Sequence, residues 1–443
     1  MPHRVAAFLG LIAALLAPTY VASQESVTSV PVTAAISSTD RQKALGILDG
    51  VSKGIQQLYY DPKMNGVDWN AVLANARIKI AQSNSMNEAL TQIAIAVDSL
   101  HDSHTTFQPP ARPYRLDFGF EYQIVWSLCF VTRVRPGSDA EAKGLKAGAQ
   151  ILSINGTAPN RHNLQSIEYL DYVLNPRPEM LIEAQYASGE KQKITVRART
   201  TQSPDLVYRP GAGARYDVIR NSENARHRMR MQWVQFGNVA IVRLPWFFYP
   251  ADDFYTLGHK IRDDEGLIVD LRGDPGGSLE TLRYFLGMFF DHDVKVFDTV
   301  GRKKTSPEMA KQERAIYYPG KLIVLVDSQS ASASEIFARV VQLEKRGTVI
   351  GDRTSGSVME ATGYYFASSG VDYGAEVTIA NLIMTDSKSL EHQGVNPDEV
   401  AFPHPDDLES GRDPVLARAA KEFGVILSPE AAGKLFPYEW PKD

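Results

Sequence analysis

The stretch that decides the fold is Leu322-Ile323-Val324-Leu325-Val326, which is followed by Ser330-Ala331-Ser332-Ala333-Ser334-Glu335. Five consecutive apolar residues predict a strand that is buried on both faces of a sheet. A helical segment at 335–343 comes next, so the serines lie at a strand-to-helix turn. A serine there has free backbone N–H groups and a positive helix end beside it. That geometry suits a nucleophile that generates an oxyanion, although an ordinary helix cap has a similar composition.

A second unit of the same kind precedes the first one along the chain. Leu267-Ile268-Val269-Asp270-Leu271 leads into Arg272-Gly273-Asp274-Pro275-Gly276-Gly277, and a helical segment follows at 280–289. Paired glycines let the backbone approach a ligand, and their N–H groups can point at an anion. A tight turn is the alternative, and a phosphate loop is disfavoured because no Gly-Lys-Ser/Thr ending is present. Two such units predict a layered α/β core, which we place at 203–443.

Upstream of this core, residues 113–202 read as short strands and turns. A strand at 130–134, a turn with Pro136-Gly137-Ser138, a short helix at 140–145 and a strand ending in Asn155-Gly156 follow one another. This order resembles a PDZ domain. PDZ domains bind the C-terminal segment of a peptide as an added strand and hold its carboxylate with backbone N–H groups. The resemblance places that loop at Phe118-Gly119-Phe120, and a PDZ-like fold used only as a spacer is the alternative.

A small helical region is predicted at 40–112. Asp40 is the expected cap of a helix whose apolar residues follow a four-three spacing from Ala44 to Leu58. A second helix is expected from Asp68 to Ala81. A third is expected to start at the capping box that Ser85 and Glu88 can form. Pro109-Pro110 and Pro113 then mark a boundary.

The first 39 residues are predicted to be a targeting segment and a linker. His3 and Arg4 precede an apolar run at 5–17, and Val21-Ala22-Ser23 suits signal-peptidase cleavage after residue 23. A membrane anchor is the alternative, but the run is shorter than the ~20 residues needed to span a bilayer. We therefore expect a signal peptide at 1–23, a linker at 24–39, and an exported protein without a stable membrane anchor.

Composition excludes several classes of function. The chain has 443 residues, of which 44% are hydrophobic, so two or three packed domains are possible. A net charge of −5 gives no general attraction to nucleic acid. Because Cys129 is the only cysteine, no intramolecular disulfide can form, and a cysteine nucleophile or a Cys-rich metal site is disfavoured.

Taken together, the segments resemble the serine peptidase family of C-terminal processing (tail-specific) proteases and the tricorn core. The resemblance covers nearly the whole mature chain. It implies a serine endopeptidase with a layered ClpP/crotonase-like α/β core, a PDZ domain and a small N-terminal helical region. Its motifs stand in family order as Asp102-Ser103-His104-Thr105, Leu267 to Gly277, Ser330 to Glu335, Gly351-Asp352-Arg353-Thr354 and Glu391-His392-Gln393-Gly394-Val395-Asn396-Pro397-Asp398.

The resemblance also assigns the groups that perform acyl transfer. The residue that matches the nucleophile is Ser332, and the Ala333 N–H together with that of Gly276 or Gly277 matches the oxyanion hole. One branch of the family uses a lysine as general base, and that position is occupied here by Ser357.

The tricorn branch uses a histidine preceded by a serine, with a distant glutamate behind them. The matching residues are His104, Ser103 and Glu391, so the resemblance implies a Ser-His-Ser-Glu site. Histidine acts as a base near neutral pH, but its tautomer and orientation need an acceptor behind it. The competing base is His101, and the competing orienting group is Asp102.

These observations predict an exported serine endopeptidase that acts on peptide or protein substrates without a metal or cofactor. Two alternatives remain. One is a non-catalytic protein that binds peptides or apolar ligands on the same fold. The other is an acyl-chain hydratase or thioesterase, which the predicted export and the PDZ-like region disfavour. Composition and motifs leave the oligomeric state open.

Overall fold

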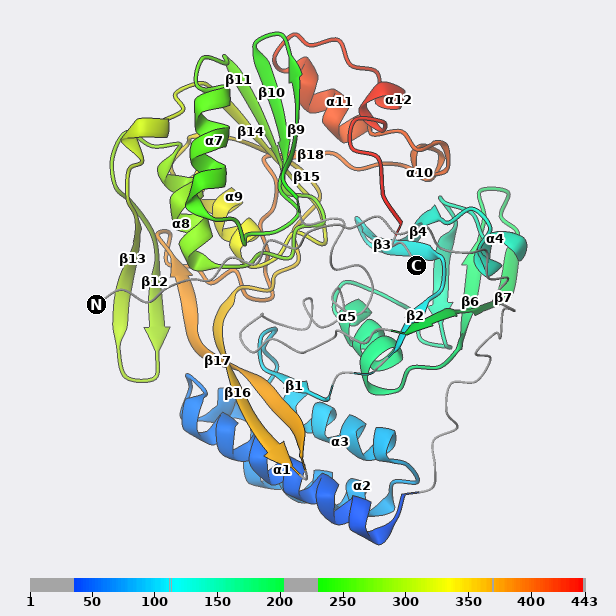
Figure 1. Cartoon of the computed structure of the whole chain (residues 1–443). Coiled ribbons are helices and arrows are strands. Elements are labelled where there is room, and N and C mark those ends of the chain that lie inside the picture. The colour runs from blue at the N-terminus through cyan, green and yellow to red at the C-terminus, as the bar shows by residue number, and fades with distance from the viewer. Residues whose placement is uncertain (1–35, 111, 113, 203–229, 369, 441–443) are drawn as a thin grey trace, which may run out of the picture.

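The computed structural model describes residues 36–440, except residues 111, 113, 203–229 and 369 (Figure 1). The predicted signal peptide at 1–23 and the predicted linker as far as residue 35 lie outside this part of the chain. Within the described residues, no helix combines the length and the apolar character that crossing a membrane requires.

The catalytic-type core is built on a six-stranded sheet. Its strand order is β18-β15-β14-β11-β10-β9, and all neighbours are parallel except β9 and β10. The strands are β9 (Gln232–Phe236), β10 (Val239–Arg243), β11 (Gly266–Asp270), β14 (Lys321–Val326), β15 (Gly347–Gly351) and β18 (Glu399–Val400).

Helices cover both faces of this sheet, which explains its near-continuous apolar strands (Figure 1). Along β11, Leu267 and Val269 pack with α7, α8 and α9, whereas Ile268 packs on the opposite face with α11. Each fully buried side chain of this kind contributes ~1.5–3 kcal/mol. The predicted layered α/β core is therefore confirmed. The helices are α7 (Ala251–Ile261), α8 (Leu279–Gly287), α9 (Ala333–Leu343) and α11 (Pro414–Lys421).

The N-terminal region consists of helices α1 (Ser38–Leu58), α2 (Trp69–Gln82) and α3 (Met86–Asp98). The predicted cap of the first helix was wrong: Ser37 is the N-cap, because its hydroxyl accepts the Asp40 N–H at 3.0 Å. The predicted linker therefore extends two residues into the helix. The second and third helices start as predicted, because Asp68 and Ser85 each accept a backbone N–H of the first turn.

A second sheet joins these helices to the core. Its longest strand, β17 (Val371–Met384), packs at one end against α1 and at the other end in the core of the catalytic-type region. The neighbouring strand β16 (Met359–Ser368) also packs closely against α1. This contact requires glycine at position 54, since a Cβ there would lie 2.3 Å from the ring of Tyr364 in β16. The other strands are β1 (Thr106–Gln108), β12 (Val294–Gly301) and β13 (Thr305–Ala310).

The PDZ-like region is an antiparallel sheet of order β3-β4-β5-β6-β7, with β3 at its edge. Asn155 and Gly156 form the predicted tight turn, both with positive φ. The strands of this sheet are β3 (Phe120–Val125), β4 (Leu128–Val134), β5 (Gln150–Ile154), β6 (Glu179–Gln185) and β7 (Lys191–Arg197). A separate antiparallel pair consists of β2 (Tyr114–Asp117) and β8 (Arg199–Gln202).

The remaining elements are short. The PDZ-like region carries α4 (Asp139–Ala142), α5 (Leu164–Glu168) and the π-helical η2 (Tyr169–Leu174). The 3₁₀ turns are η1 (Met64–Gly66) and η3 (Arg314–Ile316), and the C-terminal segment carries α10 (Pro405–Ser410) and α12 (Pro429–Ala432). The predicted helix at 140–145 thus ends earlier, at Ala142, where Gly144 takes a positive φ.

Candidate active site

Ser332 lies at the N-cap of α9, directly after the turn that leaves β14. Its φ of 56° and ψ of −117° are strained for a residue with a side chain, and such strain is found at functional turns. Its N–H donates to the carbonyl oxygen of Ser357 at 3.0 Å. The backbone thus holds this half-buried serine in one orientation.

The turn after β11 packs directly against the Ser332 turn. The Ser330 hydroxyl donates to the Leu271 carbonyl at 2.8 Å, and the Ala331 N–H donates to the Asp274 carbonyl at 2.9 Å. A Cβ at Gly276, whose φ is +93°, would lie only 2.7 Å from the Ser332 Cβ. Only glycine fits there, so the paired glycines predicted from the sequence lie beside the predicted nucleophile.

The backbone N–H groups at this contact differ in what they bind. The Gly276 N–H donates to Asp274 Oδ1 at 2.7 Å, so it is not available to an oxyanion. The N–H groups of Gly277 and Ala333 form no hydrogen bond with any other described residue. Gly276 thus provides the close approach, and the donor pair left for an oxyanion is Gly277 with Ala333.

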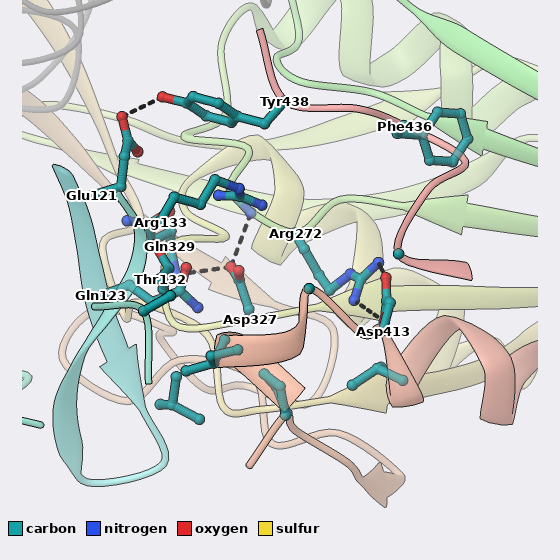
Figure 2. Close-up of a pocket in the computed structure, with 18 of the residues that line it drawn as sticks. Glu121, Gln123, Thr132, Arg133, Arg272, Asp327, Gln329, Asp413, Phe436 and Tyr438 are labelled. Carbon is teal, nitrogen blue, oxygen red and sulfur yellow. Dashed lines mark hydrogen bonds and ion pairs between the residues drawn. The ribbon is translucent and has the colours of Figure 1, made fainter. Parts of the chain in front are cut away.

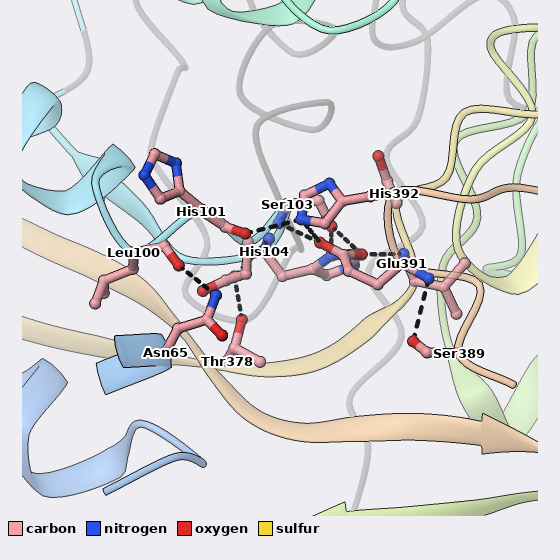
Figure 3. Close-up of polar contacts among 12 residues, drawn as sticks. Asn65, Leu100, His101, Ser103, His104, Thr378, Ser389, Glu391 and His392 are labelled. Carbon is pink, nitrogen blue, oxygen red and sulfur yellow. Dashed lines mark hydrogen bonds and ion pairs between the residues drawn. The ribbon is translucent and has the colours of Figure 1, made fainter. Parts of the chain in front are cut away.

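Three of the predicted site residues form a hydrogen-bonded chain (Figure 3). Ser103 Oγ lies 2.7 Å from His104 Nδ1 and 2.9 Å from Glu391 Oε2. The Ser103 N–H also donates to Glu391 Oε1 at 2.7 Å. Residues that are 288 positions apart in the sequence therefore meet as the relay predicted from the resemblance.

The chemistry of the donors and acceptors fixes the histidine tautomer. A carboxylate only accepts, so the Ser103 hydroxyl donates its single proton to Glu391 and accepts the Nδ1–H of His104. The Nε2 of His104 is then unprotonated and can act as a base. Burial lowers the pKa of His104 from its ordinary value of 6.5, although the carboxylates of Glu391 and Asp102 oppose this shift.

Asp102 orients the loop and not the imidazole ring, so the competing hypothesis for this residue was wrong. Its Oδ1 accepts the N–H groups of His104 at 3.0 Å and Thr105 at 2.7 Å, and the Thr378 hydroxyl at 2.5 Å. Its Oδ2 accepts the Tyr59 hydroxyl at 2.9 Å. Tyr59, the residue that follows α1, and Thr378 in β17 were not predicted, because no local motif marks either of them as a partner of Asp102.

The side chain of His101 is exposed and points away from the relay, so it lies outside the site (Figure 3). Its carbonyl oxygen instead lies 2.8 Å from Nε2 of His392, a residue with a φ of 60°. The same Nε2 is 3.6 Å from Glu391 Oε1. His392 therefore covers the exposed side of Glu391 and contacts the loop that carries His104.

Residues 357 and 358 lie between the nucleophile turn and the relay and form hydrogen bonds to both. Ser332 binds the carbonyl of Ser357, and the next N–H, that of Val358, donates to Glu391 Oε2 at 2.8 Å. Within the described residues, no hydrogen bond joins the Ser332 hydroxyl to the His104 ring. Catalytic hydrogen bonds of this kind commonly tighten only when substrate binds.

The position expected for a lysine base holds the hydroxyl of Ser357, which lies 2.9 Å from Ser355 Oγ. The side chain cannot take a proton from a nucleophile near neutral pH. The nearby guanidinium of Arg353 stays protonated at any working pH.

A cavity of about 560 Å³ lies between the PDZ-like region and the core (Figure 2). Its walls are the edge strand β3, core residues such as Asp327 and Gln329, and the C-terminal segment. The Tyr438 hydroxyl donates to the Glu121 carboxylate, and the Arg133 guanidinium stacks 4.6 Å from the Tyr438 ring. Neither Ser332 nor His104 lines this cavity.

A second, smaller cavity of about 40 Å³ shares Gln329 with the first. It lies between α5 and the loop residues Ser328, Gln329 and Ser355. The Ser328 hydroxyl donates to the Ile124 carbonyl at the end of β3. This hydrogen bond joins β3 to the loop that precedes Ser332.

Residues of the predicted carboxylate-binding loop already form contacts within the PDZ-like region. Phe118 and Phe120 are buried, and Gly119 has a φ of +73° with its N–H donating to Asp117 Oδ1 at 2.9 Å. The guanidinium of Arg243 also lines the 560 Å³ cavity, and it interacts electrostatically with the carboxylates of Asp270 and Asp327.

Two family models match parts of this chain. Residues 238–401 match the model of peptidase family S41, and residues 117–171 match that of the PDZ domain. A putative tricorn protease homolog 2 of Streptomyces coelicolor is 23% identical over 415 residues, which are 84% of this chain and 31% of that protein. The tail-specific protease of Haemophilus influenzae is 27% identical over 231 residues, 50% of this chain and 30% of the relative.

The carboxyl-terminal-processing protease of Synechocystis is 27% identical over 270 residues, 60% of this chain and 57% of the relative. The chain thus spans about a third to a little over half of the length of these three relatives. The names of all three relatives describe proteases.

Solved structures support the fold. Mature CPAF aligns with a TM-score of 0.64 at 15% identity, covering 88% of this chain and 100% of that one. The photosystem II D1 C-terminal processing protease aligns with a TM-score of 0.52 at 20% identity. The alignment covers 90% of this chain and 100% of that one. This chain is therefore similar to peptidase family S41 over residues 238–401 and to the PDZ domain over residues 117–171.

Proposed function

We propose that this chain is an exported serine endopeptidase in which Ser332 is the nucleophile and His104 is the general base. The observation that carries the proposal is the Glu391–Ser103–His104 chain of hydrogen bonds, with a tautomer that leaves His104 Nε2 free to accept a proton. The segment that binds Glu391 through Val358 also binds the Ser332 backbone. Export is proposed from the targeting segment at 1–23.

The proposed reaction proceeds through an acyl-enzyme. Ser332 Oγ forms a bond to the scissile carbonyl carbon while His104 Nε2 takes the hydroxyl proton. The resulting oxyanion accepts hydrogen bonds from the N–H groups of Gly277 and Ala333, and one such donor is worth roughly 10²- to 10³-fold in rate. As the C–N bond breaks, His104 returns the proton to the leaving amine. Water then hydrolyses the ester with His104 again acting as base.

The PDZ domain is proposed to capture the C-terminal ends of substrates along β3. Edge strand β3 has its second side open to the 560 Å³ cavity, so a peptide can add there as a further strand. Arg243 lines the same cavity, and its guanidinium is proposed to bind a terminal carboxylate in addition to its interactions with Asp270 and Asp327. The smaller cavity between α5 and Ser328 supports a path from this groove toward Ser332.

We predict that proteins with a free, apolar C-terminus are cut faster than the same proteins with an amidated end. A hydrogen bond to a charged group is worth ~1.5–3 kcal/mol, so kcat/KM should differ by about tenfold or more. Cleavage followed by mass spectrometry measures the difference, and Arg243→Gln should reduce it. Equal rates for both ends, unaffected by Arg243→Gln, would refute the capture role.

A non-catalytic binding protein is the second candidate, because the 560 Å³ cavity lies apart from Ser332 and no hydrogen bond joins Ser332 Oγ to His104 in the described structure. Digestion of an unbiased peptide library separates the two. An endopeptidase produces internal cuts that are absent with Ser332→Ala. A binding protein depletes peptides without cutting them, and that result would contradict the proposal.

A further inference from the structure

Glu335, in the first turn of α9, is a fully buried carboxylate with four hydrogen-bond donors around it. Its Oε2 accepts the N–H groups of Ser332 at 3.0 Å and Ser357 at 2.9 Å. Its Oε1 accepts the Gly356 N–H at 2.8 Å and the Thr354 hydroxyl at 2.5 Å. One of these donors belongs to the nucleophile turn, and the other three belong to the loop after β15.

An ordinary helix cap does not account for this arrangement. A capping glutamate at the third helical position binds back to the N-cap N–H, which is the single contact with Ser332. The three remaining contacts attach the loop 354–357 to the start of α9. The next residue of that loop, Val358, donates its N–H to Glu391 Oε2. A continuous path of contacts therefore runs from Ser332 through Glu335 and the loop to the relay that holds His104.

We propose that Glu335 is a positioning residue, which fixes the separation and orientation of Ser332 relative to His104 by holding the nucleophile turn and the loop 354–358 together. This inference rests on the proposed serine peptidase mechanism. It assigns Glu335 no contact with substrate.

A carboxylate is the group that this position requires. All four neighbours are donors, and only an ionised carboxylate accepts at both oxygens. A glutamine would aim an NH₂ group at two of them. No charged side chain of the described residues lies within ion-pair distance of Glu335. Burial raises the pKa of Glu335 to about 7, and the four hydrogen bonds to its carboxylate oppose this shift, so Glu335 is ionised above pH 7.

The test compares Glu335→Gln with Asp398→Asn at pH 8.5, where wild-type Glu335 is ionised. Asp398 is the matched control, because it also joins α9 to a strand: it accepts Val349 N–H at 2.8 Å and the Gln342 amide at 2.9 Å, without touching the loop 354–358. For Glu335→Gln we expect kcat to fall about 10²-fold with KM nearly unchanged, since small displacements of reacting groups have effects of this size. Asp398→Asn should keep the wild-type kcat.

Two further readouts separate positioning from simple loss of structure. Thr354→Val should lower kcat, and Thr354→Ser, which restores the hydroxyl, should recover it. The wild-type kcat should fall near pH 7 as Glu335 takes up a proton. The residual activity of Glu335→Gln should fall only below pH 6.5, where the buried His104 becomes protonated.

The outcomes are distinguishable. Unchanged kcat in Glu335→Gln, or a loss of kcat matched by Asp398→Asn, overturns the positioning role while leaving the peptidase intact. A wild-type chain that cuts no peptide and takes up no fluorophosphonate overturns the proposed function, and the positioning role fails with it. A 10²-fold loss of kcat with an unchanged fluorophosphonate rate at Ser332 also contradicts the proposal, because that rate reports the nucleophile directly.

Discussion

Ser332→Ala is expected to abolish peptide hydrolysis and His104→Ala to reduce kcat by roughly 10³-fold or more, while the double variant is little worse than either. Without the Ser332 hydroxyl no acyl-enzyme can form, so only the oxyanion donors and substrate binding remain. Without His104 the hydroxyl keeps its proton. Steady-state kinetics on one peptide measure all three variants.

Two controls accompany this prediction: the thermal stability of Ser332→Ala and the activity of His101→Ala. Thermal unfolding should show that Ser332→Ala keeps the wild-type Tm, because the Ser332 backbone carries the contacts that hold the turn. His101→Ala should be nearly silent, since the His101 side chain is exposed and points away from the relay. If His101→Ala were the crippling change, the assignment of the base would be wrong.

Glu391→Gln and Ser103→Ala are each expected to lower kcat by about 10- to 10³-fold with little change in KM. Glu391 stabilises the imidazolium that forms in the transition state, and it acts through the Ser103 hydroxyl at 2.9 Å. Because either change breaks the same chain of hydrogen bonds, the double variant should lose less than the product of the two effects.

A separate variant tests whether another base is at work. Ser357→Ala removes only a hydroxyl that lies against Ser355, while the Ser357 backbone keeps its bonds to Ser332 and Glu335. This variant should therefore stay close to wild type. Severe loss in Ser357→Ala together with a harmless Ser103→Ala would exclude the relay.

The fold was predictable wherever burial of an element produces a regular pattern of apolar residues in the sequence. The apolar runs at 267–271 and 322–326 predicted strands covered on both faces, because alternate residues of each strand enter different hydrophobic cores. The N-cap at Ser37 was missed, since Asp40 is an equally good cap by composition. Only the path of the preceding chain decides which residue accepts the first N–H.

The candidate site was predictable in its parts but not in its connections. Motif order identified the Ser103, His104 and Glu391 side chains that form the relay. The partners of Asp102 and the donors around Glu335 come from elements far apart in the sequence. No periodicity or local motif records such contacts, because they depend on how β17 and the loop after β15 pack in three dimensions.

Labelling with a serine-directed fluorophosphonate, followed by peptide mapping, tests the central claim most directly. The probe forms a covalent bond only with an activated nucleophile, and it needs no knowledge of the natural substrate. We predict a single adduct on Ser332 in the wild-type chain, and a labelling rate that falls roughly 10³-fold in His104→Ala. An adduct on another residue, or an equal rate in His104→Ala, would contradict the account.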